Sequence, residues 1–243
     1  MSQTIARPRR GLSTFFVGPL VRAGGVVAVG AVALGSLSGC SLFSEDFEPQ
    51  GAAATQARAD ALVRVADLAD GASAGGRVIA TATRDGCISG QNNWKIRDTY
   101  SHECAVEASR IVVVTTGATS VADELTAGDA RLRALGCRPT TFGGLDRVRD
   151  EYWRQDNPNV QSQGAAGLPM VTYVCGDREL VVQPMSARAS ETALGLLVES
   201  RLGTDELLSA DWYANDDVLA LRESDAELAF VVTASEGYYR TRF

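Results

Sequence analysis

Residues 104–115 read CAVEASRIVVVT, and this segment is the clearest β-strand candidate in the sequence. It ends in Ile111–Val114, an unbroken β-branched run, and such residues favour the pleated, half-buried surface of a strand. Gly176-Asp177-Arg178 is a hairpin signal between two further strand candidates. The remaining candidates along the chain are residues 77–83, 170–175, 179–184, 218–222, 227–233 and 238–242, with a turn expected at Glu236-Gly237 between the last two.

Three helices are expected around these strands. The first spans about residues 57–69 and ends at Gly71; its apolar residues Ala61, Leu62, Val65 and Leu68 recur at helical spacing. Ser120 can cap a second helix, with Asp123 at the capping-box position and Val121, Leu125, Leu132 and Leu135 on one face. Ser190 can cap a third, with Leu194, Leu197 and Val198 facing inward. The polar segment 143–169 between them is interpreted as a long excursion. The fold class predicted is α+β: an antiparallel or mixed sheet with about three helices packed on one face, stapled by disulfides.

The N-terminus has the pattern of an export leader. Arg7, Arg9 and Arg10 precede an uncharged stretch of small apolar residues, 23–36, which is short for a membrane-spanning helix. Leu37-Ser38-Gly39-Cys40 then resembles the lipobox of bacterial lipoproteins, in which the cysteine thiol receives diacylglycerol. An uncleaved membrane anchor is the alternative. We therefore expect a signal peptide at 1–39, a lipidated Cys40, a flexible tether over 40–56 and one extracytoplasmic domain over 57–243.

The charge of the chain excludes some partners. The leader holds four of the 23 basic residues and none of the 30 acidic ones, so the mature chain keeps 19 basic residues and a net charge of −11. Binding to nucleic acid without sequence preference needs a basic footprint, and none is present. The same balance argues against electrostatic attraction of the domain to anionic lipid. The membrane is expected as a partner only through Cys40.

Four cysteines remain after Cys40, an even number that favours disulfides in an exported protein. Of the three possible connectivities we favour Cys87–Cys104, which brackets a polar loop between neighbouring strands, and Cys137–Cys175, which ties the end of a helix to a strand. The rivals are a zinc site or a thiol nucleophile using His102, the single histidine of the chain. No CxxC spacing supports a metal site.

The segment between the first two cysteines, CISGQNNWKIRDTYSHEC, is the most distinctive in the chain. Trp94, Lys95 and His102 could line a recognition surface, since binding hot spots use aromatic and basic side chains. Trp153 could rim the same groove. The simpler expectation is that Trp94 packs down on the sheet and that Trp153 packs on the core.

Cys87–Lys95, Tyr100–Cys104 and Leu135-Gly136-Cys137 resemble segments of predicted lipoproteins of actinobacteria that have no assigned function. The resemblance covers about residues 80–140. It implies a lipid anchor on the outer face of the cell membrane, and it supplies no activity, substrate or catalytic residue.

The sequence contains no convincing catalytic set. It has no G-x-S-x-G, no P-loop, no dinucleotide-binding glycine motif and no EF-hand, so no cofactor or metal is expected. Adjacent acidic pairs occur, but such pairs usually mark a solvated face or a helix N-terminus. The leading hypothesis is therefore a non-enzymatic envelope lipoprotein that binds a partner protein or a small ligand. The alternatives are an extracytoplasmic hydrolase acting through carboxylates and an accessory subunit of an envelope complex.

Overall fold

The structure is a computed structural model of the 243-residue chain. It describes residues 48–114, 120–140, 143–186, 205–213, 215–223, 226 and 228–242. All of these belong to the compact unit Leu42–Phe243. The predicted leader, Cys40 and the helix expected from Ser190 lie outside the described residues. Among the helices that are described, none is long and apolar enough to cross a membrane.

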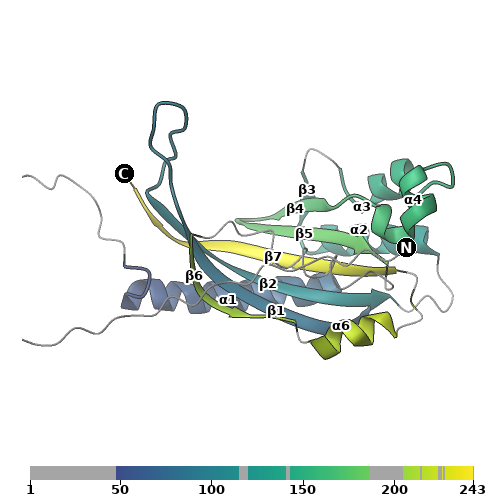
Figure 1. Ribbon diagram of the computed structural model, residues 1–243, viewed down its shortest axis with the longest axis horizontal. Helices are drawn as coiled ribbons and strands as arrows, with labels where there is room; N and C mark the ends of the chain where they lie inside the picture. The colour runs from purple at the N-terminus through teal and green to yellow at the C-terminus, as the bar shows by residue number, and fades with distance from the viewer. Residues whose placement is uncertain are drawn as a thin grey trace, which may run out of the picture. The chain divides into compact units, whose positions relative to one another are not determined.

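A seven-stranded sheet is the centre of the fold, and every neighbouring pair of strands in it is antiparallel. The order is β3-β4-β5-β7-β2-β1-β6 (Figure 1). The strands are β1 (Arg77–Ser89), β2 (His102–Val114), β3 (Arg138–Pro139), β4 (Val171–Cys175), β5 (Arg178–Met185), β6 (Glu206–Asp211) and β7 (Leu228–Thr241). The predicted α+β class and the antiparallel sheet are confirmed.

The β-branched run lies where the sequence predicts a strand, inside β2, and β2 is paired on both sides by β1 and β7. Its alternate residues Val106, Ala108 and Val112 face one apolar cluster, whereas Ile111 and Val113 face another. Both faces of β2 are therefore buried at this end, which explains a continuous apolar run instead of an alternating one.

The larger cluster is covered by two helices. Helix α1 (Ala52–Ser73) packs along β2 and β7 through Ala61, Val65 and Leu68 (Figure 1). Helix α2 (Val121–Ala134) adds Val121, Leu125 and Leu132 to the same cluster. The predicted capping box is confirmed, because Ser120 accepts from the Asp123 N–H and the Asp123 carboxylate accepts from the Ser120 N–H. Leu135, expected on the same face, is instead 42% exposed.

The smaller cluster lies on the opposite face of the sheet. Helix α6 (Asn215–Arg222) packs on β1 and adds Leu221 to this cluster, which also contains Ile111 and Val113 of β2. The prediction of a strand at 218–222 is therefore wrong. A short apolar run fits a strand or a buried helix equally well by periodicity, and the helix pattern prevails here.

Segment 143–169 carries more structure than the predicted excursion. It contains α3 (Leu145–Arg147), the π-helical turn η1 (Val148–Tyr152), α4 (Pro158–Gln163) and the 3-10 turn η2 (Gly164–Gly167). Leu145, Val148, Ala165 and Leu168 are buried in the larger cluster. These apolar residues are few but well spaced, and they fold the segment onto the core.

Two boundaries also differ from expectation. The two strands predicted at 227–233 and 238–242 form one strand, β7, in which Glu236-Gly237 is no turn. The pairing shifts where Cys104 faces Tyr239 and Ala105 faces Gly237, so Tyr238 occupies a bulge. Near the start of the described chain α1 begins at Ala52, so the last residues assigned to the tether are helical.

Candidate functional site

Both predicted disulfides are present. Cys87 and Cys104 are directly opposed in the β1–β2 pair and are joined, and Cys137 after α2 is joined to Cys175 at the end of β4. The rival metal and thiol readings of these cysteines are thereby excluded. The first bridge closes the base of a hairpin, residues 90–101, which projects away from the sheet between β1 and β2 (Figure 1).

Backbone contacts fix this hairpin at its base. The Gly90 N–H donates to the Ser101 carbonyl at 2.7 Å, and the Ser101 N–H donates to the Thr241 carbonyl at 2.9 Å. A Cβ at Gly90 would lie 1.9 Å from the carbonyl oxygen of Tyr100, so only glycine allows the two arms to approach this closely. The hairpin is thus connected to the end of β7 as well as to β1 and β2.

The tip has its own hydrogen-bonded turn. The Asn93 side-chain oxygen accepts from the backbone N–H groups of Lys95 and Ile96, each at 2.9 Å, and the Asn93 N–H donates to the Ile96 carbonyl at 2.8 Å. Below the tip, the Asp98 carboxylate accepts from the Gln91 N–H at 2.6 Å. These local bonds give the tip a defined backbone without help from the sheet.

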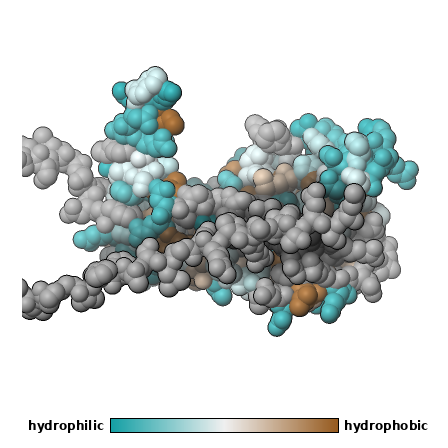
Figure 2. Space-filling model, viewed as in Figure 1, coloured by the Kyte–Doolittle hydropathy of each residue, from teal (hydrophilic) through white to brown (hydrophobic). Residues whose placement is uncertain are grey.

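The side chains at the tip face solvent. Trp94 is 85% exposed and Ile96 is 47% exposed. The Lys95 ammonium lies 4.7 Å from the centre of the Trp94 ring, close enough for a cation–π contact. The expectation that Trp94 packs down on the sheet is therefore wrong, because the hairpin carries it away from the apolar clusters. Figure 2 shows this projection as mostly hydrophilic with a hydrophobic residue on it.

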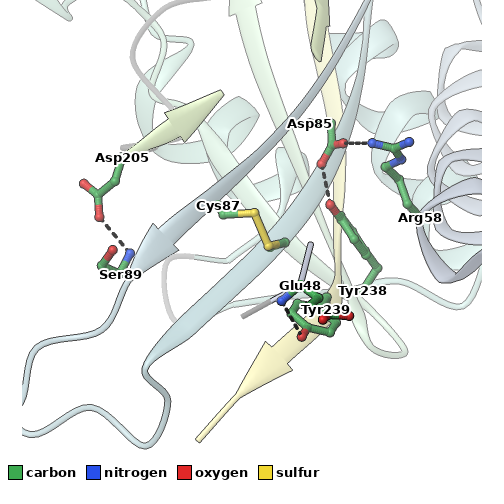
Figure 3. The surroundings of a disulfide bond; sticks show 9 residues. Glu48, Arg58, Asp85, Cys87, Ser89, Asp205, Tyr238 and Tyr239 are labelled. Carbon is green, nitrogen blue, oxygen red and sulfur yellow. Dashed lines mark hydrogen bonds and ion pairs between the residues drawn. A yellow bond between two sulfur atoms is a disulfide. The ribbon is translucent and has the colours of Figure 1, made fainter. Parts of the chain in front are cut away.

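The described chain begins beside the hairpin base. The Glu48 N–H donates to the Tyr239 hydroxyl at 3.3 Å, and Tyr239 is the strand partner of Cys104 (Figure 3). Any tether that precedes Glu48 therefore reaches the domain at the end from which the hairpin projects.

A buried carboxylate lies next to the same disulfide. Asp85 is 3% exposed and accepts from Arg58 of α1 at 3.1 Å and from the Tyr238 hydroxyl at 2.8 Å (Figure 3). Burial, and then the hydrogen bond to Asp85, raise the pKa of Tyr238, so the phenol remains a donor. The trio fixes α1 to the sheet beside the hairpin base. The sequence does not predict this trio, because its three residues lie far apart along the chain and share no pattern.

His102 lies at the hairpin base, near a serine and an aspartate, and these are the three residue types of a hydrolase triad. It is the strand partner of Ser89, whose backbone N–H donates to the Asp205 carboxylate at 2.7 Å. Hydrogen bonds from Ser89, with a smaller contribution from His102, lower the pKa of Asp205. In a catalytic triad the histidine stands between the serine and the carboxylate, whereas here the carboxylate binds the serine residue directly. The contacts indicate a structural anchor for the start of β6.

Trp153 is separated from Trp94. It follows η1, next to α3 and α4, at the end of the sheet away from the hairpin, and it packs against the larger apolar cluster (Figure 1). The two tryptophans do not share a groove, and the packing expectation holds for Trp153. Of the predicted binding residues, the structure groups only Trp94 and Lys95 at the tip; Ile96 belongs with them and was missed. Its neighbours Lys95 and Arg97 give a polar–apolar–polar alternation, which predicts burial of the apolar residue, so no local pattern indicated that Ile96 is exposed.

An open hollow of about 400 Å³ lies at the start of the described chain, lined by residues 48–51 and Glu206. The space between the end of α1, α2 and the sheet has a volume of about 20 Å³ and is lined mainly by apolar residues such as Leu132 and Phe230. That volume holds about one water molecule. Within the described ranges no three His, Cys, Asp or Glu residues gather as a metal site. Comparison with protein-family models, curated proteins and solved structures finds no match to the chain.

Proposed function

We propose that the protein is a lipoprotein anchored through Cys40 to the outer face of the cell membrane, and that it works by binding, with the tip of hairpin 90–101 as its contact element. The proposal has two parts, the anchor and the contact element, and each has its own test.

The anchor is supported by the basic leader, the apolar stretch and the lipobox-like Leu37–Cys40. Two acyl chains give stable membrane attachment, whereas one gives only marginal binding. Radiolabelled palmitate should enter the wild-type protein and should be absent from Cys40→Ala. Equal labelling of both proteins would exclude lipidation at Cys40.

One observation carries the contact element: Trp94 is 85% exposed at the end of a hairpin held by a disulfide and by local hydrogen bonds. A tryptophan so placed adds nothing to the core, and ordering a side chain of this size for a partner costs little because it has few rotatable bonds. Tryptophan and basic residues are also enriched where binding energy is concentrated.

Photocrosslinking in intact cells tests the contact element. A benzophenone amino acid at position 94 should form covalent adducts on illumination. The control position is Val63 of α1, which is 61% exposed but lies outside the hairpin. Adducts at 94 and none at 63 are expected. Equal labelling at both positions, or none at either, would contradict a binding role for the tip.

A further inference from the structure

We infer that the hairpin tip binds the membrane itself: Trp94 and Ile96 enter the headgroup region of the bilayer that holds the lipid on Cys40, so the domain is attached at a second point. This inference rests on the proposed function and names the partner of the tip.

The chemistry of the tip matches a bilayer interface. Tryptophan is enriched at the level of the lipid headgroups, because its ring is apolar and its N–H is polar. Ile96 adds an aliphatic side chain beside it, and Lys95 and Arg97 add two cations that can meet lipid phosphates while their stems lie along apolar surface. The carboxylate of Asp98 is turned to the Gln91 N–H inside the hairpin.

The distribution of charge favours contact of an anionic bilayer with the hairpin tip instead of with a broad face of the acidic domain. Residues 90–101 contain Lys95, Arg97 and Asp98 as their charged residues, a net charge of +1, whereas the mature chain carries −11. Lys95 is the single lysine of the whole sequence. An anionic surface repels the acidic domain and attracts the two cations, each of which strengthens binding about five-fold close to such a surface. The overall acidity therefore orients the domain with the hairpin toward the lipid.

The lengths of chain agree with this orientation. From Cys40 to Glu48 there are eight residue steps, which span at most about 29 Å when extended. From Cys87 to Trp94 there are seven steps, at most about 25 Å. Glu48 contacts Tyr239 beside that disulfide, so the tether and the hairpin start from the same end of the domain. Both can reach a single surface.

A protein partner fits the tip less well. A stable protein interface buries about 800 Å² on each side, and the exposed apolar side chains of this hairpin are two, Trp94 and Ile96. A bilayer needs no complementary surface and is held close by the lipid anchor, which gives it a high effective concentration.

Quenching of Trp94 fluorescence by brominated lipid tests the inference. The lipidated full chain carrying Trp153→Phe and Trp212→Phe keeps Trp94 as its one tryptophan. It is reconstituted into phosphatidylcholine–phosphatidylglycerol vesicles with bromines near the headgroup end of the acyl chains. We expect a blue-shifted emission and quenching of more than half of the Trp94 signal. Emission that stays solvent-like and unquenched would overturn the inference.

A matched variant controls for proximity. Trp94→Phe with Trp153→Phe keeps Trp212, which is 42% exposed after β6, and its emission should not be quenched. Equal quenching of Trp212 would show adsorption without orientation and would also overturn the inference. In a chain that begins at Ser41, and so carries neither the leader nor the lipid, Lys95→Gln should weaken binding to anionic vesicles about five-fold and leave binding to neutral vesicles unchanged.

The crosslinking experiment separates this inference from the proposed function. Lipid adducts at position 94 support both. A discrete protein adduct at 94 would overturn membrane binding and leave the proposed function standing. No adduct at 94 would remove the contact element and the inference together, and would leave the Cys40 anchor to its own test.

Discussion

Two segments of this chain are closed by disulfides, and they end in opposite environments. Segment 138–174, closed by Cys137–Cys175, folds onto the sheet and buries Leu145 and Tyr173 to within 1% of full burial. Segment 88–103, closed by Cys87–Cys104, projects outward and leaves Trp94 85% exposed. Both are polar and rich in turn residues, so composition alone does not separate them.

The difference lies in where each segment satisfies its polar groups. In the first, the Tyr173 hydroxyl donates to Asp129 of α2 at 2.6 Å and accepts from the Leu145 N–H at 2.7 Å, which fixes α3 to α2 and the sheet. In the hairpin, the turn bonds of Asn93 stay within the tip. Segment 138–174 is therefore part of the core, whereas segment 88–103 is ordered but exposed. An ordered, exposed tryptophan outside the core is better explained by a partner than by stability.

Removing either disulfide should cause the largest loss of unfolding free energy, and the loss should be greater for Cys137–Cys175 than for Cys87–Cys104. In the chain-entropy description, Cys137→Ala with Cys175→Ala, at a sequence separation of 38, costs about 4 kcal/mol of unfolding free energy. Cys87→Ala with Cys104→Ala, at a separation of 17, costs about 3 kcal/mol. Urea unfolding of each double variant measures this. A hairpin disulfide that proves the more costly would mean that the hairpin supports the core.

Single truncations should sharpen the contrast. Leu145→Ala removes a side chain that is 1% exposed and leaves a cavity in the larger cluster, so we expect a loss of about 3 kcal/mol. Ile96→Ala, at a position 47% exposed, should change the unfolding free energy by less than about 0.5 kcal/mol. Urea midpoints give both values, and similar losses in the two variants would contradict the comparison.

The buried hydroxyl of Tyr173, in the packed segment 138–174, should make the unfolding free energy depend on pH. Burial, and then the hydrogen bond to Asp129, raise the pKa of Tyr173 above its ordinary value. Above about pH 10 the unfolded chain loses this proton while the folded protein keeps it. The folded state then binds more protons, so the unfolding free energy falls as pH rises, by up to about 1.4 kcal/mol per pH unit.

Tyr173→Phe tests the assignment. It should remove the contribution of Tyr173 to this alkaline slope and leave the contribution of Tyr238, whose pKa is also raised; urea unfolding between pH 8 and pH 11 measures the difference. At neutral pH it should cost about 1–3 kcal/mol, because Asp129 and the Leu145 N–H each lose a buried partner. The same slope in wild type and variant would show that Tyr173 is not the group responsible.

Sequence reasoning succeeded where local physics is decisive. The β-branched run predicted the interior strand β2, and the Ser120–Asp123 spacing predicted the capping box. The even number of cysteines and their positions between elements predicted both disulfides. It failed where tertiary context decides. Residues 218–222 are a helix, because a short apolar run does not distinguish the two structures. Glu236-Gly237 reads as a turn and is part of a bulged strand, since β2 pairs with β7 along its whole length.

The candidate site shows the same limit. The sequence identified Trp94 and Lys95 but favoured packing for the tryptophan, because a large aromatic residue in a closed loop usually completes a core. Trp94 is exposed because the hairpin projects from the sheet. The hairpin projects because the β1–β2 pairing continues to Ser89 and His102. The contact of Arg58 with Asp85 joins two elements and leaves no pattern in the sequence.

The most direct test of the central claim, that the hairpin tip serves binding and not stability, is the unfolding free energy of a shortened variant. Residues 92–97 are replaced by Asn-Gly, so that Gln91 and Asp98, already joined by a backbone hydrogen bond of 2.8 Å, close a two-residue turn. We expect an unfolding free energy within about 0.5 kcal/mol of wild type, because residues 92–97 are exposed. A loss of more than about 2 kcal/mol would contradict it, since a change of that size requires buried contacts.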